Sequence, residues 1–302
     1  MFKNVIVGVD GRGGGRDAIA LATKLLDGEG KLTLAHVRQG PTNPYHAIAP
    51  GFLDEERETS EKLLEKERDA TGVSTELVSV VGQSPGRGLH ERAEDQEADL
   101  IVVGSCKRGV LGRVMVGDDA SAALNGAPCA VAIATAGYRE LGKPLEKLGV
   151  AYNGSPESED ALDLARELGR ETGARVSALE VVHLSAYAFG GLVAAPPMGD
   201  AIEEMLGHAE ARMRALTGVE GRAGYGLPGE DLAAFSDEVD LLIVGSRSYG
   251  PVRRLVYGST STYLERHARC SLLALPRRTD RRRGAEPESG AENAVPAKAA
   301  VT

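Results

Sequence analysis

Short apolar runs alternate along the chain with stretches in which apolar residues recur every three or four positions. The runs predict strands, and the 3.6-residue period predicts helices between them. In the first half, strands are expected near residues 3–9, 31–37, 74–81, 99–103 and 129–134, and helices near 15–27, 54–71, 85–95 and 118–125. Short, continuous apolar strands are typical of a parallel sheet that is buried on both faces. Their alternation with helices predicts an α/β fold with right-handed crossovers.

The same pattern occurs a second time. The helix after the first strand carries Ala18, and an equivalent helix carries Ala161, 143 residues later. Near the end of each half, the segments LIVVGS and LLIVGS are 141 residues apart, as are Cys129 and Cys270. Self-similarity at a nearly constant spacing indicates a duplicated domain. The weakest expected strand lies in the second copy, near residues 219–225, because it contains two glycines.

The repeat sets the expected domain limits. We expect one domain at residues 1–136 and a second at 148–276, with a polar connector at 137–147. From Arg277 onward the chain has five arginines in seven residues, followed by Glu, Gly, Ala and Pro without periodicity. Such a segment has no apolar face to bury, so we expect residues 277–302 to form a disordered tail. The alternative for the tail is an interaction arm.

Composition and charge exclude several function classes. The formal net charge of the 302 residues is −9, which argues against a nucleic-acid surface, since that needs a concentrated basic face. We expect no membrane association, because no apolar run reaches the roughly 20 residues of a membrane helix. The opening FKNVIVGVD is strand-like rather than a signal peptide. The three cysteines, none in a CxxC pair, suit a reducing compartment, so a cytoplasmic location is expected.

The segment after the fourth strand of the second half carries the clearest chemical signal. It reads GSRSYGPVRRLVYGSTS, in which Gly245 precedes Ser248 by two intervening residues and nine more residues separate Ser248 from Gly258 and Ser259. Parallel sheets bind ligands at the carboxyl ends of their strands, and glycine lets backbone N–H groups approach phosphate oxygens. Gly258 and Ser259 open a helix, whose positive end favours an anion. The alternative is a tight turn that needs glycine only for its own geometry.

The first half has the equivalent segment GSCKRGVLGRVMVGDDA, with Gly104, Lys107 and Gly117 followed by Asp118. Both segments resemble the loop G-x₂-G-x₉-G-[S/T] of nucleotide-binding universal stress proteins. The resemblance covers nearly all of residues 1–276. It implies two doubly wound α/β domains, each a five-stranded parallel sheet of order 3-2-1-4-5 with helices on both faces. It also implies an intrachain pseudo-dimer in which the last strands of the two halves pair.

The resemblance implies that ATP, with or without Mg²⁺, binds in these loops and near an aspartate after the first strand. That aspartate is kept as Asp10 in the first half and replaced by Asn153 in the second. The second glycine of the loop is Lys107 in one half and Ser248 in the other. The hydroxyl residue at the end of the loop is kept in the second half as Ser259. In the first half it is replaced by Asp118, whose carboxylate repels phosphate. We therefore expect ATP in at least one half, with the second half favoured.

Three hypotheses about activity stay open. The first is the ATP-binding stress-response protein, as a monomer with pseudo-dimeric halves or as a homo-oligomer. The second is a nucleotide-free scaffold for an unidentified protein partner, which Asp118 and Ser248 favour, whereas Gly258, Ser259 and Asp10 favour the first. The third, an electron-transfer or nucleotide-hydrolysing enzyme, has only the architecture behind it. Because the sequence has no nucleophile elbow, HExxH motif or acid–base pair at a recognisable spacing, we expect no enzymatic activity.

Overall fold

The described residues of the first half form five strands and four helices. The computed structural model describes residues 1–39, 51–106, 114, 121, 125–142, 144–183, 198–246, 255 and 258–277. In its first half the strands are β1 (Phe2–Gly8), β2 (Leu26–Gln39), β3 (Glu76–Gly82), β4 (Leu100–Gly104) and β5 (Ala130–Ala134). The described helices of this half are α1 (Gly13–Leu25), α3 (Phe52–Thr71), α4 (Pro85–Asp95) and the short α6 (Tyr138–Leu141).

The second half repeats this order. Its strands are β6 (Lys147–Ala151), β7 (Arg175–Val182), β8 (Glu220–Tyr225), β9 (Leu241–Gly245) and β10 (Ser271–Leu275). Its described helices are α7 (Pro156–Thr172), α8 (Met198–Ala215), α9 (Pro228–Phe235) and α10 (Ser259–His267). The alternation expected from the apolar pattern is therefore confirmed in both halves.

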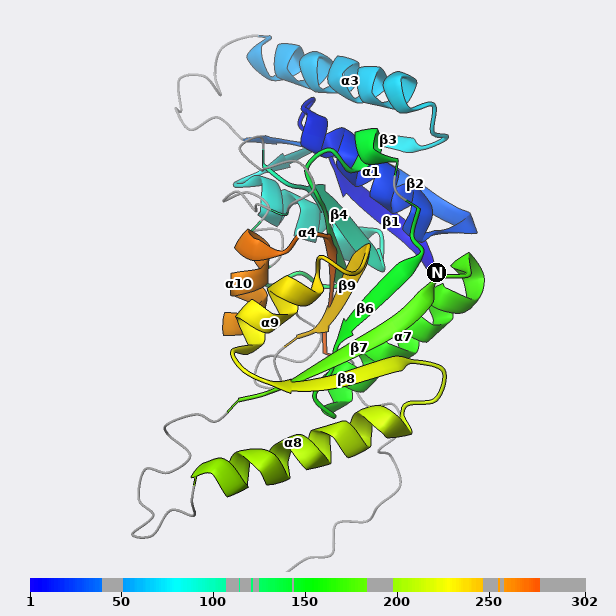
Figure 1. Ribbon diagram of the computed structural model, residues 1–302. Helices are drawn as coiled ribbons and strands as arrows, with labels where there is room; N and C mark the ends of the chain where they lie inside the picture. Colours follow the sequence, from blue (N-terminus) through cyan, green and yellow to red (C-terminus); the bar gives the residue numbers. More distant parts are fainter. Residues whose placement is uncertain are drawn as a thin grey trace, which may run out of the picture.

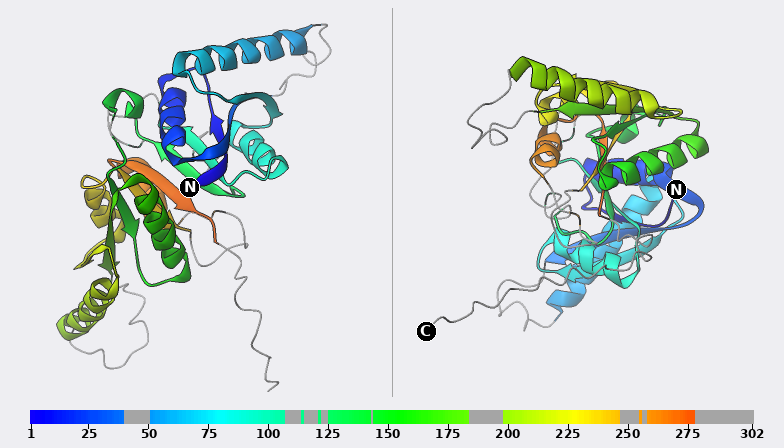
Figure 2. Two further views of the ribbon diagram at one scale, coloured as in Figure 1. Left: turned by 90° about the vertical axis from the view of Figure 1, so that its right-hand side faces the viewer. Right: turned by 90° about the horizontal axis from the view of Figure 1, so that it is seen from below.

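All ten described strands belong to one sheet, in the order β3-β2-β1-β4-β5-β10-β9-β6-β7-β8 (Figure 1). Each half is parallel and has the expected 3-2-1-4-5 order. The halves meet where β5 and β10 pair antiparallel, with Leu273 opposite Ala132. Figure 2 shows the halves side by side with β10, in orange, at their junction. The pseudo-dimer through the last strands is confirmed, and the two sheets are continuous.

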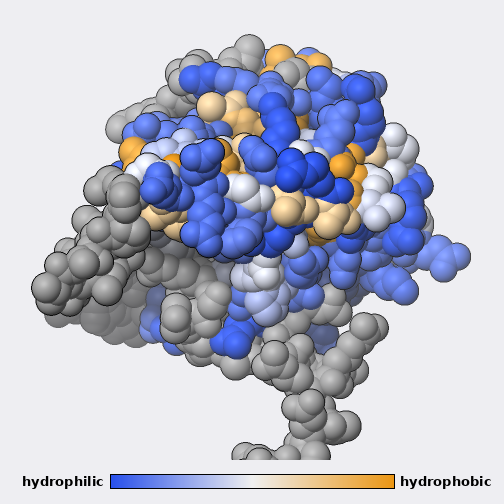
Figure 3. Space-filling model, turned by 60° about the horizontal axis from the view of Figure 1, so that its bottom comes forward, coloured by the Kyte–Doolittle hydropathy of each residue, from blue (hydrophilic) through white to orange (hydrophobic). Residues whose placement is uncertain are grey.

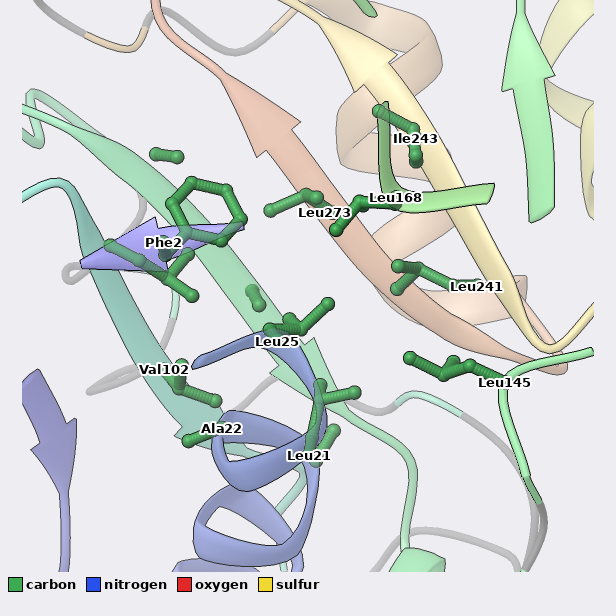
Figure 4. Close-up of a cluster of buried hydrophobic side chains, with 14 of the residues drawn as sticks. Phe2, Leu21, Ala22, Leu25, Val102, Leu145, Leu168, Leu241, Ile243 and Leu273 are labelled. Atoms are coloured by element: carbon green, nitrogen blue, oxygen red, sulfur yellow. The ribbon is translucent and has the colours of Figure 1, made fainter. Parts of the chain in front are cut away.

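The helices cover both faces of the sheet in two layers that each extend across the halves. Buried residues of α1 and α7 form one layer, together with single side chains from α3 and α8. Figure 4 shows part of it, with Leu25 from α1, Leu168 from α7 and Leu273 from β10 in one cluster. The other layer contains Leu89 of α4, Phe235 of α9 and Leu264 of α10. The two halves thus share their cores as well as their sheet.

Backbone hydrogen bonds across the junction repeat with the spacing of the duplication. The N–H of Val114 donates to the carbonyl of Ala268, and the N–H of Leu255 donates to the carbonyl of Ala127, both at 2.9 Å. The donors are 141 residues apart, and so are the acceptors. This reciprocity means that Val114, between β4 and β5, is hydrogen-bonded to the second half, while Leu255, between β9 and β10, is hydrogen-bonded to the first.

Local features account for two of the described helix starts and for one weak strand. Ser84 accepts a hydrogen bond from the N–H of Arg87 and so caps α4, and Ser155 caps α7 in the same way. The weak strand expected near 219–225 forms as β8. Its Gly221 is required by packing, because a Cβ there would lie 2.6 Å from the carbonyl oxygen of Met213 in α8.

Three expectations need correction or lie outside the described residues. The second strand begins at Leu26, five residues earlier than expected, with a register irregularity against β1, and α1 accordingly ends at Leu25. The connector contains the helix α6, whose four residues are too few to show a helical periodicity in the sequence. Most of the helix expected near 118–125, and the tail beyond Arg277, lie outside the described residues.

A buried carboxylate holds α6 against the first domain. Asp17 of α1 is 6% exposed and accepts hydrogen bonds from the N–H groups of Gly137 and Arg139 at 2.8 and 2.9 Å. Burial raises the pKa of this carboxyl, although the two backbone donors act in the opposite direction. Tyr138 is also buried, and the Lys24 ammonium lies 5.1 Å from its ring centroid. These contacts fix the start of the connector.

Candidate functional site

Each half has a cavity at the carboxyl ends of its parallel strands, where α/β sheets bind ligands. In the second half the cavity has a volume of about 290 Å³ and is lined by Asn153, Gly245, Gly258 and Ser259. The structure therefore brings together four of the five second-half residues predicted from the sequence. The fifth, Ser248, lies outside the described residues.

The start of α10 forms one wall of this cavity. Gly258 is the N-cap residue, no side chain caps the helix, and its first turn contains no acidic residue. The first N–H groups of a helix lack partners within it, and they carry the positive end of the helix dipole. The wall formed by residues 258–261 therefore offers backbone donors and hydroxyl groups to a ligand.

Gly245 and Asn153 also have local structural roles. A Cβ on Gly245 would lie 2.7 Å from the carbonyl oxygen of Glu157, so this glycine lets the start of α7 approach the end of β9. The Oδ1 atom of Asn153 accepts a hydrogen bond from the N–H of Ser155 at 3.1 Å. The amide oxygen is thus engaged in the turn before α7, and Gly154 of this turn has a φ of +73°.

Glu157 brings a carboxylate to the same cavity. It is 6% exposed, lies in the first turn of α7 and has Nε of Arg277 at 3.5 Å from its Oε1. The guanidinium offsets the charge that would otherwise oppose an anion. The sequence analysis did not assign Glu157 to the site, because a carboxylate is a common and favourable residue at a helix start. In the repeat, Glu157 is equivalent to Gly14 of the first copy. This difference between the copies was the signal in the sequence that the two cavities differ here.

A charged cluster lies beside the cavity at the end of β7. Arg212 of α8 forms an ion pair with Glu180, which is 5% exposed. Tyr152 donates a hydrogen bond to Glu159. Burial raises the pKa of Tyr152 to about 12, and the hydrogen bond to Glu159 adds to this effect. The cluster thus connects α7 with the end of β6 and α8 with β7.

The first-half cavity is larger, at about 930 Å³, and Asp10 and Gly104 line it. The predicted residues Lys107 and Gly117 lie outside the described residues, as does Asp118. Asp10 accepts a hydrogen bond from the N–H of Arg12 at 3.0 Å and pairs with its guanidinium at 3.4 Å. A Cβ on Gly104 would lie 1.9 Å from the carbonyl oxygen of Gly14, so this glycine allows the close approach of α1.

His36 also lines the first-half cavity, at the end of β2. Its Nδ1 atom lies 2.8 Å from the carbonyl oxygen of Val9. Because a carbonyl only accepts, Nδ1 carries the hydrogen in this contact, and Nε2 keeps a lone pair in the neutral ring. In the second half Glu180 takes the corresponding position and is held by Arg212. The two cavities therefore differ at this strand end, where His36 lines the first cavity and Glu180 is not among the residues that line the second.

The described residues give two further findings about chemistry. Among them, no group of three or more His, Cys, Asp or Glu side chains could hold a metal ion. In the same part of the chain, no helix has both the length and the apolar character that crossing a membrane requires. On the face drawn in Figure 3, hydrophobic residues form small areas among hydrophilic ones.

Comparisons with known proteins agree with the duplicated fold. The model of the universal stress protein family matches residues 1–135 and again residues 144–276. A universal stress protein of Mycobacterium tuberculosis is 25% identical over 230 residues, which are 69% of this chain and 75% of that protein. One from Thermus aquaticus is 27% identical over 136 residues, 43% of this chain and 97% of that protein. The crystal structure of a universal stress protein from Archaeoglobus fulgidus superimposes with a TM-score of 0.65 at 19% identity, covering 91% of this chain and 98% of that one.

Proposed function

The chain belongs to the universal stress protein family, and we propose that it is a stress-response regulatory protein that binds an adenine nucleotide, ATP or a close analogue, in its second half. One observation carries the proposal. Asn153, from the end of β6, and Gly245, Gly258 and Ser259, from the segment after β9, line one cavity at the carboxyl edge of the sheet. The uncapped start of α10 in this cavity suits the phosphate chain.

The two cavities differ in volume and in the charge near the expected phosphate position. A cavity of about 290 Å³ is just below the ~300–1,000 Å³ typical of ligand pockets, so it accommodates the phosphates with the nucleoside at its mouth. The first-half cavity, at about 930 Å³, is large enough for a whole nucleotide. There, however, the sequence places Asp118 where Ser259 stands in the second half, and its carboxylate opposes a phosphate.

Equilibrium titration of the full chain with labelled ATP, with and without Mg²⁺, tests the proposal. Ser259→Asp should weaken binding at least about fivefold, because like charges a few Å apart are unfavourable by about 1 kcal/mol or more. Aspartate is also a good residue at a helix start, so this variant should fold normally. Asp118→Ser is the matched variant and should create or strengthen a first-half site.

Two outcomes would redirect the proposal. An affinity that Ser259→Asp leaves unchanged and Asp10→Ala abolishes would move the site to the first half. Absence of binding at millimolar ATP would favour the second candidate function, a nucleotide-free scaffold for a protein partner. Two structural observations support that candidate: Gly245 is already explained by the close approach of α7, and the amide oxygen of Asn153 already accepts a hydrogen bond from Ser155.

A further inference from the structure

The chain that leaves the last strand of the first domain packs directly on α1. Asp17 of α1 accepts hydrogen bonds from the N–H groups of Gly137 and Arg139, and Tyr138 between them is buried. Gly137 lies only three residues after the end of β5. In the first copy of the domain, a carboxylate on the helix therefore fixes the segment that follows the last strand.

The second copy repeats this carboxylate on α7. The 143-residue offset of the two helices places Asp160 at the position of Asp17. The 141-residue offset of the last strands places Arg278 and Asp280 at the positions of the two residues whose N–H groups bond to Asp17. Asp160 is half-buried and lines a groove of about 1270 Å³ between α7 and the first domain, which we call the α7 groove. The duplication thus identifies an acceptor on the helix and two donors on the tail.

The described part of the chain ends beside the same groove. Leu275 and Pro276 line the α7 groove, and Nε of Arg277, the last described residue, lies 3.5 Å from Oε1 of Glu157 in the first turn of α7. Asp160 is three residues further along α7, which puts it on the same side of the helix as Glu157. A segment that continues from Arg277 along α7 therefore meets Asp160 within one helical turn.

Charge favours the same occupant. Residues 277–283 contain five arginines and one aspartate. On α7, Glu167 stands where the first copy has Lys24, whose ammonium lies 5.1 Å from the ring centroid of Tyr138. The helix thus carries an anion in the copy whose following segment is rich in arginine. Five acidic side chains and three arginines line the α7 groove: Asp99, Asp160, Asp163, Glu167, Glu220, Arg166, Arg170 and Arg175.

We propose that residues 277–283 dock in the α7 groove, with the N–H groups of Arg278 and Asp280 donating to the carboxylate of Asp160. Glu167 lies about 10 Å further along the helix axis, a distance that the next three residues of an extended chain span, so the arginines at 281–283 approach it. Glu167 also pairs with the amino group of Met1, beside α7 in Figure 1. The start of the tail is therefore an interaction arm whose partner is α7 of the same chain.

Hydrogen–deuterium exchange of the full chain, resolved to single residues by mass spectrometry, tests the proposal. The amides of Arg278 and Asp280 should exchange at least about tenfold more slowly than in a synthetic peptide of residues 277–302, because hydrogen bonds to a carboxylate oppose their opening. Asp160→Ala should remove this protection. Glu167→Arg, or about 0.5 M NaCl with the wild type, should reduce it, since both weaken the attraction of the arginines. Glu203→Arg reverses an exposed charge on α8 and should leave the protection unchanged.

Three results would overturn the proposal. The first is exchange of the two amides in the wild type at the rate of the free peptide, and the second is protection that Asp160→Ala leaves unchanged. The third is protection that rises with protein concentration, which would assign the groove to the tail of a second copy. The melting temperature of each variant separates loss of docking from unfolding. Glu167→Arg keeps the test decisive if Asp160→Ala does not fold, because the Glu167 side chain is 48% exposed.

Discussion

Replacing Glu265 with glutamine should stabilise the protein above neutral pH and remove part of its pH dependence. Glu265 lies on α10 at the junction of the halves and is 5% exposed. Burial raises the pKa of its carboxyl to about 7, while the charge of Arg266 and a hydrogen bond with Ser121 of the first half act in the opposite direction. The folded state therefore holds a proton that the unfolded chain releases.

The sign and size follow from proton linkage. The ordinary pKa of this group is 4.5, so the folded state binds more protons than the unfolded state between pH 4.5 and about 7. The contribution of Glu265 to stability is complete below pH 4.5 and is lost as the pH rises through about 7. At about 1.4 kcal/mol per pH unit, this interval amounts to about 3 kcal/mol. Glutamine has the same shape and no charge, so the variant avoids this loss.

Urea unfolding at several pH values between about 5 and 8 measures the effect. The free energy of unfolding of Glu265→Gln should exceed that of the wild type by an amount that grows with pH, towards about 3 kcal/mol. Glu203→Gln serves as the control, because Glu203 is exposed on α8. A difference between Glu265→Gln and wild type that stays constant over this range would refute the reasoning, since only a titrating carboxylate gives the slope.

Three further predictions concern the core, a buried ion pair and the cysteines. Leu273 is fully buried at the junction, so Leu273→Ala should lower the free energy of unfolding by about 3 kcal/mol in urea; a loss below about 1 kcal/mol would contradict the shared core. Arg16→Met should lower the free energy of unfolding by about 3 kcal/mol in the same assay, because the carboxylate of Glu67, which is 1% exposed, loses its cation. Adding Glu67→Gln to this variant should restore part of the loss. Iodoacetamide should modify Cys106 of the native protein before Cys129, since burial raises the pKa of the Cys129 thiol to about 12; equal labelling by mass spectrometry would count against this.

The sequence predicts most of the fold because the apolar pattern and the repeat extend through both halves of the chain. Two identical series of short strands and helices specify two equal sheets, and the family resemblance supplied their order and the β5–β10 junction. The weak β8 forms because Gly221 lets α8 pack against it, a tertiary reason that periodicity does not contain. The short α6 went unpredicted since it depends on Asp17, a polar residue in an apolar helix face whose partners lie 120 and 122 residues away.

The candidate site was predicted in outline, since the carboxyl ends of parallel strands must lie at one edge. Asn153, Gly245 and Gly258 come together for that reason. The unequal volumes of the two cavities could not be predicted, because they depend on how side chains such as Glu157 fill the space. Ser105 after β4 and Ser246 after β9 also differ, because Oγ of Ser105 donates to the carbonyl of Ala134, whereas the buried Oγ of Ser246 has no hydrogen-bond partner among the described residues. This difference depends on side-chain rotation, which the sequence does not reveal.

The antiparallel pairing of β5 with β10 has a consequence during synthesis of the chain. β5 ends at Ala134, whereas β10, the last strand described, begins at Ser271. At a translation rate of ~5–20 residues per second, the ribosome needs about 7 to 30 s to make the intervening part. Throughout this interval the first domain carries an uncovered apolar strand edge, which can template pairing with the same edge of another nascent chain. Neighbouring ribosomes on one message therefore compete with β10 for β5, and the rate of elongation influences which pairing forms.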